Sequence, residues 1–154
     1  MTYCVALRLD TGMIFASDSR TNAGVDHIAT FSKMRVFEKK DDRVIVVLSS
    51  GNLAMTQGVV NILDKHAKSQ DEPSLWTAES MYDAAMLVGD ALREMQRRDA
   101  PFLSEHNIEP SANLLVGGQI GKEPPRLFHV YAQGNFIEAT DDTPYVQLGE
   151  SKYG

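Results

Sequence analysis

The amino-acid sequence predicts an α+β fold built from layers of sheet and helix. Strand-like segments fill the first fifty residues, two helical patterns occupy the middle of the chain, and strand-like segments return after Pro110. Because two consecutive helices separate the two groups of strands, the pattern disfavours alternating βαβ units. The length of 154 residues fits one domain, and we expect residues 1–154 to form it.

The N-terminal strands are expected to form two hairpins. In the first, Asp10-Thr11-Gly12 supplies the turn between two apolar runs, and in the second the charged segment 39–42 does so. The polar, glycine-containing stretch 18–26 between the hairpins predicts a loop. The four strands are expected at 2–9, 13–17, 34–37 and 43–50.

A change of hydrophobic period after Gly51 predicts the first helix. Apolar residues from Leu53 to Ala67 recur at helical spacing, and either Ser50 or Asn52 provides the N-cap. A second helix is expected from a cap within 74–77 to Pro101, where the proline ends it. Strands are then expected at 112–118, 126–131, 135–139 and 145–148.

Composition and charge exclude several classes of protein. Lys and Arg number 15 against 21 Asp and Glu, so the formal net charge is −6, unlike the basic surface of a nucleic-acid-binding protein. No apolar run approaches the length of a membrane-spanning helix. The single cysteine, Cys4, cannot form an internal disulfide, which favours a reducing, cytoplasmic location.

Thr2 is the first candidate for catalysis. Removal of Met1 by methionine aminopeptidase would leave a threonine whose hydroxyl and free α-amine sit on one residue. An α-amine has a pKa of about 8, so at neutral pH it can accept the hydroxyl proton. A nearby cation, held by a carboxylate, would tune that amine. The predicted hairpins bring Asp18 and Lys33 back toward residue 2.

Other chemical patterns are weaker. Asp10-Thr11-Gly12 has the composition of the aspartic-protease triplet, but it has no second copy and is typical of a hairpin turn. Gly117-Gly118 and Gly121 lack the lysine spacing of a phosphate loop. Cys4 is expected to be a small buried apolar residue. No metal site or cofactor is predicted, because no metal-ligand spacing links the histidines, which are His27, His66, His106 and His129.

Six segments stand in an order that is typical of one known family. They are Met1-Thr2, Asp18-Ser19-Arg20-Thr21-Asn22-Ala23-Gly24, Lys33, Leu48-Ser49-Ser50-Gly51-Asn52, Gly134-Asn135-Phe136 and Leu148-Gly149-Glu150-Ser151-Lys152-Tyr153-Gly154. Over essentially the whole chain, this order resembles the proteasome β-subunit family of N-terminal-nucleophile hydrolases. Three stretches are most similar to one bacterial branch of that family: Thr2-Tyr3-Cys4-Val5-Ala6, the segment 18–24 and the segment 149–154.

The resemblance implies a role for each matching residue. Thr2 would be the nucleophile, with Asp18 and Lys33 as the polar pair beside it and Ser151 as a helper near the amine. The backbone N–H groups around Ser50 and Gly51 would form the oxyanion hole. The substrate-facing positions would be Arg20, Asn22 and Leu48.

The resemblance also implies a four-layer αββα sandwich, in which two sheets pack face to face between helices. We expect the chain to be truncated at its C-terminus, with most of the second helical layer beyond Gly154. The implied function is that of a threonine-type peptidase that cleaves a peptide or amide substrate inside a ring-like or lock-washer homo-oligomer. Two alternatives stay open: an assembly scaffold without useful peptidase activity, and a non-proteolytic amidase of the same class.

The helices carry an unusual number of methionines, which bears on assembly. Their apolar side chains exceed what one sheet face needs, and exposed apolar patches usually mark interfaces. We therefore expect a methionine-rich surface that either contacts neighbouring subunits or is covered by a C-terminal part of the chain. Its residues are Met55, Met81, Tyr82, Met86 and Met95.

Overall fold

The computed structural model describes residues 2–22, 28–30, 32–69 and 71–149. Within them the chain forms two helices, α1 (Leu53–His66) and α2 (Met81–Glu105), set between two groups of strands. The strands are β1 (Tyr3–Leu9), β2 (Gly12–Ser17), β3 (Arg20–Asn22), β4 (Ile28–Thr30), β5 (Met34–Lys39), β6 (Arg43–Gly51), β7 (Ala112–Ile120), β8 (Arg126–Val130), β9 (Phe136–Glu138) and β10 (Tyr145–Gly149).

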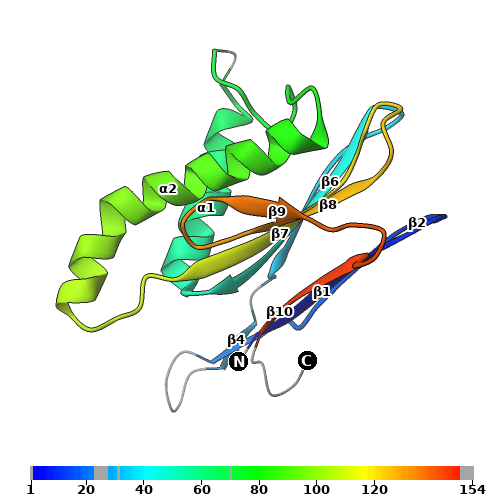
Figure 1. The fold of residues 1–154 in the computed structure, drawn as a ribbon. Coiled ribbons are helices and arrows are strands. Elements are labelled where there is room, and N and C mark those ends of the chain that lie inside the picture. Colours follow the sequence, from blue (N-terminus) through cyan, green and yellow to red (C-terminus); the bar gives the residue numbers. More distant parts are fainter. Residues whose placement is uncertain (1, 23–27, 31, 70, 150–154) are drawn as a thin grey trace.

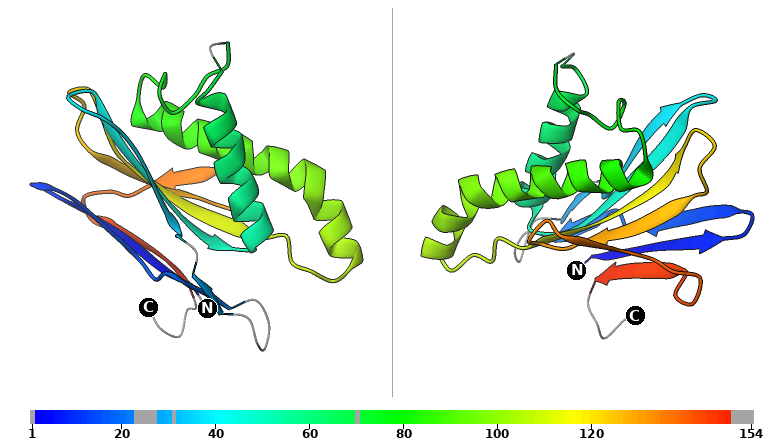
Figure 2. Two further views of the ribbon diagram at one scale, coloured as in Figure 1. Left: turned by 180° about the vertical axis from the view of Figure 1, so that it is seen from behind. Right: turned by 45° about the horizontal axis from the view of Figure 1, so that its top comes forward.

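Two antiparallel sheets pack face to face. One has the strand order β10-β1-β2 and the other β5-β6-β7-β8-β9, while β3 and β4 form a separate short ribbon. Both helices cover the outer face of the five-stranded sheet (Figure 1), and the turned views show the three-stranded sheet on its opposite face (Figure 2). The predicted α+β class is confirmed, and within the described residues helices cover one face of the sandwich.

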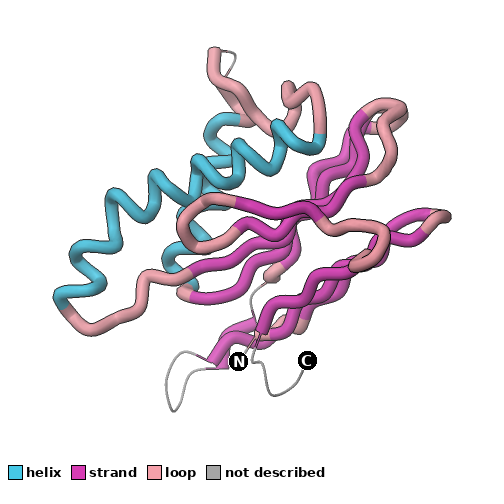
Figure 3. Tube along the Cα trace, in the orientation of Figure 1, coloured by secondary structure: helices cyan, strands magenta, loops and turns pink. Residues whose placement is uncertain are grey.

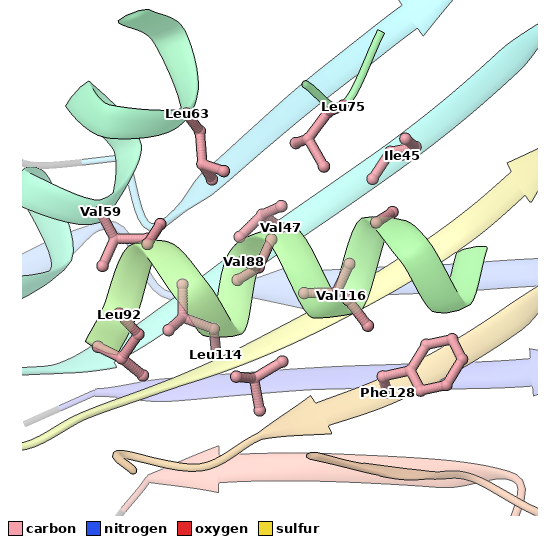
Figure 4. Close-up of a cluster of buried hydrophobic side chains, with 14 of the residues drawn as sticks. Ile45, Val47, Val59, Leu63, Leu75, Val88, Leu92, Leu114, Val116 and Phe128 are labelled. Carbon is pink, nitrogen blue, oxygen red and sulfur yellow. The ribbon is translucent and has the colours of Figure 1, made fainter. Parts of the chain in front are cut away.

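The five-stranded sheet has an apolar core on each face. Along β6, alternate side chains point to opposite faces, so Ile45 and Val47 join the core beneath the helices and Val46 and Leu48 join the core between the sheets. The larger core packs Val88 and other α2 residues onto β6 and β7 (Figure 4). β6 is therefore packed on both faces, and its C-terminal end lies at the candidate site.

The predicted helices agree with the structure in number and type, but two short strands, β3 and β4, were not predicted. The segment 18–26, expected as a loop, contains the short strand β3, which pairs with β4 (Figure 3). Tertiary pairing made a strand from a polar sequence that has no alternation of its own.

Both ends of α2 differ from the prediction. The helix begins at Met81 because the Ser80 side chain accepts the N–H of Asp83, and a Glu123 carboxylate accepts the N–H of Met81. It continues through Pro101 to Glu105. A proline removes one helical hydrogen bond, and the chain tolerates this loss near the exposed C-terminal end. Asn52, one of the two candidates, caps α1 by accepting the N–H groups of Ala54 and Met55.

The predicted methionine surface is largely wrong. Met55, Met81 and Met95 are completely buried in the core beneath the helices. Helical spacing cannot separate the inner face of a helix from its flank, and these three side chains fill the space between α1, α2 and the sheet. Tyr82 and Met86 do remain exposed, at 50% and 41%.

Candidate active site at the N-terminal strand

Asp18 is held opposite the residue that follows Thr2. The β1–β2 hairpin pairs Cys4 with Ser17, which sets Asp18 beside Tyr3. The N–H of Tyr3 donates to Asp18 Oδ1 at 2.7 Å, and the N–H of Asp18 donates to the Tyr3 carbonyl at 3.0 Å. The carboxylate therefore contacts the first peptide N–H after Thr2.

The second oxygen of the same carboxylate binds Lys33. Lys33 Nζ donates to Asp18 Oδ2 at 2.5 Å, and the lysine side chain is only 5% exposed. The Lys33 carbonyl accepts the N–H of Ser49 at 2.9 Å, which attaches the residue before β5 to the end of β6. The ion pair between Asp18 and Lys33 that the sequence predicted is present.

A small cavity of about 20 Å³ lies where these segments meet. By this measure one water molecule needs roughly 10–15 Å³, so the space is about the size of one or two water molecules. Three chain segments form its wall: the N-terminus, the residue before β5, and the turn from β6 into α1. The lining residues among those described are Thr2, Lys33, Ser49, Ser50, Gly51, Leu53 and Thr56.

Strand geometry separates the two predicted oxyanion donors. The N–H of Ser49 points to the β5 side of β6, toward Lys33, whereas the N–H of Asn52 donates to the Ser111 carbonyl beside β7. Because successive N–H groups of a strand point to opposite edges, that of Ser50 points toward β7 and that of Gly51 toward the β5 edge, where the cavity lies. The geometry favours Gly51 as the donor.

Two glycines make close backbone approaches at the site. Gly51 has φ +115°, and a Cβ there would lie 2.3 Å from the Ser111 carbonyl oxygen. Gly149, at the end of β10, has φ +147°, and its Cβ would lie 2.3 Å from the carbonyl oxygen of Thr2. Glycine at these positions lets β7 and β10 pack directly against the backbone of the site.

The remaining predicted residues fall into three groups. Ser151 lies outside the described residues, so the structure does not place it. Arg20 and Asn22 lie at the two ends of β3, on the ribbon that follows Asp18. Leu48 is completely buried between the sheets and is not among the cavity-lining residues. Its side chain points away from the helices because it lies an odd number of positions from Ile45 and Val47, which face them.

Cys4 lies close enough to the ion pair to be influenced by both charges, and it is buried as its strand pattern predicted. Its side chain is fully buried, and Sγ donates to the Ser49 carbonyl at 3.5 Å. Burial raises the pKa of the thiol from its ordinary value of 9.0 to about 11; the negative charge of Asp18 also raises it, while Lys33 and the hydrogen bond lower it. At neutral pH the thiol is therefore protonated.

The other candidate groups lie away from this centre. Asp10 belongs to the turn between β1 and β2, at the opposite end of that hairpin. His66 forms a contact with Glu72, and burial lowers the pKa of His129 in β8. No group of three or more His, Cys, Asp or Glu in the described part of the chain is arranged to hold a metal ion. Likewise, no described helix is long and apolar enough to span a membrane.

Sequence reasoning missed three lining residues, Ser49, Leu53 and Thr56. Ser49 and Thr56 are buried polar residues, at 6% and 3% exposure. Ser49 continues the face of Ile45 and Val47, and Thr56 follows Leu53 by one helical turn, so both face the same space between β6 and α1. The sequence signal for these two residues was a hydroxyl side chain at a position of β6 and of α1 that otherwise carries apolar, inward-facing residues.

Comparison with solved structures places the chain among the proteasome-like β-subunits. It is similar to Anbu (ancestral beta-subunit) from Yersinia bercovieri, with 53% identity and a TM-score of 0.90, and to Anbu from Hyphomicrobium sp. strain MC1, with 49% and 0.85. The helical assembly of the Anbu complex from Pseudomonas aeruginosa matches with 51% identity and a TM-score of 0.92. Each match covers 99% of this chain and 62% of the other.

The chain therefore belongs to the Anbu family, which is the bacterial branch that the sequence segments indicated. It spans about 62% of the length of the structures it matches. No protein-family model and no curated protein sequence matches the chain.

Proposed function

We propose that the protein is a threonine-type peptidase whose nucleophile is the hydroxyl of Thr2. One observation carries the proposal: the Asp18 carboxylate contacts both Lys33 Nζ and the peptide N–H that follows Thr2. This carboxylate fixes a buried cation and the N-terminal residue in one arrangement. The lysine of an ordinary surface ion pair is exposed to solvent. Lys33 is instead buried at the wall of a cavity that Thr2 also lines.

The proposed mechanism needs the free α-amine of Thr2. After Met1 is removed, the amine accepts the hydroxyl proton as the Thr2 oxygen attacks the amide carbonyl carbon. Positive charge on Lys33 favours the neutral, basic form of the amine. The Gly51 N–H stabilises the oxyanion, the amine returns its proton to the leaving nitrogen, and an ester on Thr2 remains. Water, deprotonated by the same amine, then hydrolyses this ester and restores the hydroxyl.

The other predicted site residues have supporting roles in this proposal. Ser151 acts as a helper near the amine, since β10 ends beside the Thr2 carbonyl. Arg20 and Asn22, on β3, contact the substrate backbone or side chains. Ser50 contributes to the cavity wall.

We further propose that the protein works as a homo-oligomer on a peptide or amide substrate. A relative with 51% identity is known in a helical assembly, which supports an open ring or lock-washer of subunits. The reduced and buried Cys4 is compatible with the predicted cytoplasmic location.

We also propose that a second layer of helices completes an αββα sandwich. The outer face of the three-stranded sheet exposes large apolar side chains, including Tyr3, Ile14 and Tyr145. An apolar sheet face of this kind is normally packed against another layer. Helices on this face would complete the sandwich.

Amide hydrolysis by the natively expressed protein tests the proposed function. A library of short peptide amides is expected to be cleaved by the parent and by Thr2→Ser at a lower rate, because serine keeps hydroxyl and amine together. Thr2→Ala, which keeps only the amine, should show no turnover. If Thr2→Ala cleaves as fast as the parent, Thr2 is not the nucleophile. If the folded parent cleaves nothing and retains Met1, the protein is the assembly scaffold.

A further inference from the structure

Two exposed apolar side chains form a ridge on α2. Tyr82 is 50% exposed, and Met86, one helical turn later, is 41% exposed. The Tyr82 ring packs edge to face on Phe128 in β8 and on Phe136 in β9, so the ridge lies toward the β9 edge of the five-stranded sheet. Large apolar side chains exposed side by side usually mark a contact surface.

A groove lies at the opposite edge of the same sheet. It runs between β5, which ends the sheet on that side, and the C-terminal end of α1, and its volume is about 300 Å³. The rings of Phe37 and Trp76, which both line the groove, meet edge to face with their centroids 5.8 Å apart. A groove with aromatic walls is suited to an aromatic or methionine side chain from a partner.

The ridge and the groove lie on opposite flanks of the helical layer. α1 packs on β6, and α2 packs on β7, β8 and β9, so each helix covers a different side of the sheet (Figures 1 and 2). One chain therefore cannot bring its own ridge into its own groove. A second copy can, and because the two surfaces differ, the pair keeps a free ridge at one end and a free groove at the other.

The charges of the two surfaces are complementary. Lys68 lines the groove, in which Arg35 is already paired with Asp64. Glu79 and Asp83 lie at the start of α2, beside the ridge. In the described part of the chain, Lys68, Glu79 and Asp83 form no ion pair. Docking the ridge in the groove brings acid toward lysine, whereas ridge-to-ridge pairing would set acid against acid.

We infer that Tyr82 and Met86 of one copy of this chain dock into the groove between β5 and α1 of the next copy. The inference rests on the proposed homo-oligomer and names the surfaces that hold it together. A head-to-tail contact of this kind builds a ring if its rotation closes and a helical array if it does not. The helical assembly known for a relative with 51% identity is consistent with such a contact.

The test is chemical cross-linking between copies of the full-length protein. Met86→Cys and Lys68→Cys are combined in one chain and treated with a short, flexible bismaleimide. Cys4 is fully buried and should not react. The double variant should give a ladder of covalent dimers, trimers and larger species, because every copy carries both halves of the contact. Each single-cysteine variant should stay monomeric on a denaturing gel, since a ridge does not meet a ridge.

Mixing of surface variants tests the direction of the contact. Met86→Lys impairs the ridge, and Ala67→Glu places a bulky acid in the groove. Each variant alone should elute from a sizing column at a smaller mass than the parent, and an equimolar mixture should recover a 1:1 complex through the one intact ridge and the one intact groove. Ile108→Lys, at an apolar residue that is 46% exposed outside both surfaces, is the matched control and should elute like the parent. Thermal unfolding verifies that each variant is folded.

The outcomes separate the contact from assembly itself. If the parent elutes as an oligomer but the double-cysteine variant gives no ladder, the head-to-tail contact is wrong and the proposed homo-oligomer stands. Dimers formed as readily by the Met86→Cys variant alone would also overturn it, in favour of ridge-to-ridge pairing. A parent that is monomeric at micromolar concentration overturns the contact and the homo-oligomer together, and leaves the proposed role of Thr2 to its own test.

Discussion

Asp18 joins three parts of the site through one side chain and its own backbone. It binds the Tyr3 N–H, the Tyr3 carbonyl and Lys33 Nζ. The sequence predicted the approach of Asp18 and Lys33. The β1–β2 hairpin returns Asp18 to the start of the chain, whereas Lys33, which precedes β5, reaches it because the two sheets pack face to face. The sequence could not place Leu48 correctly, since a shift of one residue along a strand exchanges the two faces.

The ion pair leads to the first prediction. Asp18→Asn and Lys33→Ala should each slow covalent capture of Thr2 by a small β-lactone, an electrophile that acylates the threonine hydroxyl, about 100-fold or more, because the charge that tunes the amine is misplaced or lost. Asp18→Asn should also destabilise the fold by about 1–3 kcal/mol, less than a fully buried pair because the carboxylate is 33% exposed. Intact-mass kinetics and urea denaturation measure both effects.

Asp64→Asn is the matched control. Asp64 pairs with Arg35, whose side chain is 53% exposed, so the same substitution should change stability by about 0–1 kcal/mol and leave capture unchanged. Equal capture rates for Lys33→Ala and the parent would show that the Asp18–Lys33 pair has only a structural role.

Cys4 gives a prediction on pH. With a folded-state pKa of about 11 against 9.0, the thiol contributes stability that is fully present below pH 9 and is lost as pH rises through 11. In the folded protein at pH 8 a disulfide reagent such as DTNB should therefore react with no thiol, and after denaturation with one per chain. Rapid reaction in the folded state would contradict the buried, protonated thiol.

At the scale of elements, the predictable features were those set by local pattern. The hairpins, α1 and the body of α2 follow from alternation, turn residues and helical spacing. The ends of α2 do not, because Glu123 reaches its N-terminus from the β7–β8 turn, and that contact exists only in the folded chain. The strand β3 likewise depends on its partner β4.

The contact of α2 with the β8–β9 turn supports the third prediction. A Cβ at Gly89 would lie 2.3 Å from the Gly134 carbonyl oxygen, so Gly89→Ala should destabilise the protein by about 1–3 kcal/mol, although alanine favours helix by up to ~1 kcal/mol. Thermal or urea unfolding measures the difference.

Gly58→Ala in α1 is a matched glycine-to-alanine control. Its Cβ would meet the flexible end of the Met95 side chain, not backbone, so the cost should be smaller than that of Gly89→Ala. The reverse order would mean that α2 can move away from the turn more easily than Met95 can change rotamer.

At the scale of the whole molecule, the sheets bring the N-terminal strand, β5 and β6 to one place, and this juxtaposition makes the site. The chain also exposes apolar side chains on α2 and on the outer sheet face, among them Tyr82, Met86 and Ile14. We expect the natively expressed protein to elute from a sizing column at many times its monomer mass. Tyr82→Lys with Met86→Lys should shift the elution toward smaller species if α2 contacts neighbours. A parent that is monomeric at micromolar concentration would contradict the assembly proposal.

The central claim is that Thr2, freed of Met1, is the nucleophile. Its most direct test is the intact mass of the natively expressed protein before and after exposure to an epoxyketone, which requires both the hydroxyl and the free amine of an N-terminal threonine. The account predicts a chain that lacks Met1 and gains one adduct, located on Thr2 by peptide mapping and absent in Thr2→Ala. Amide hydrolysis at the parent rate by a chain that retains Met1, or an adduct on another residue, would contradict it.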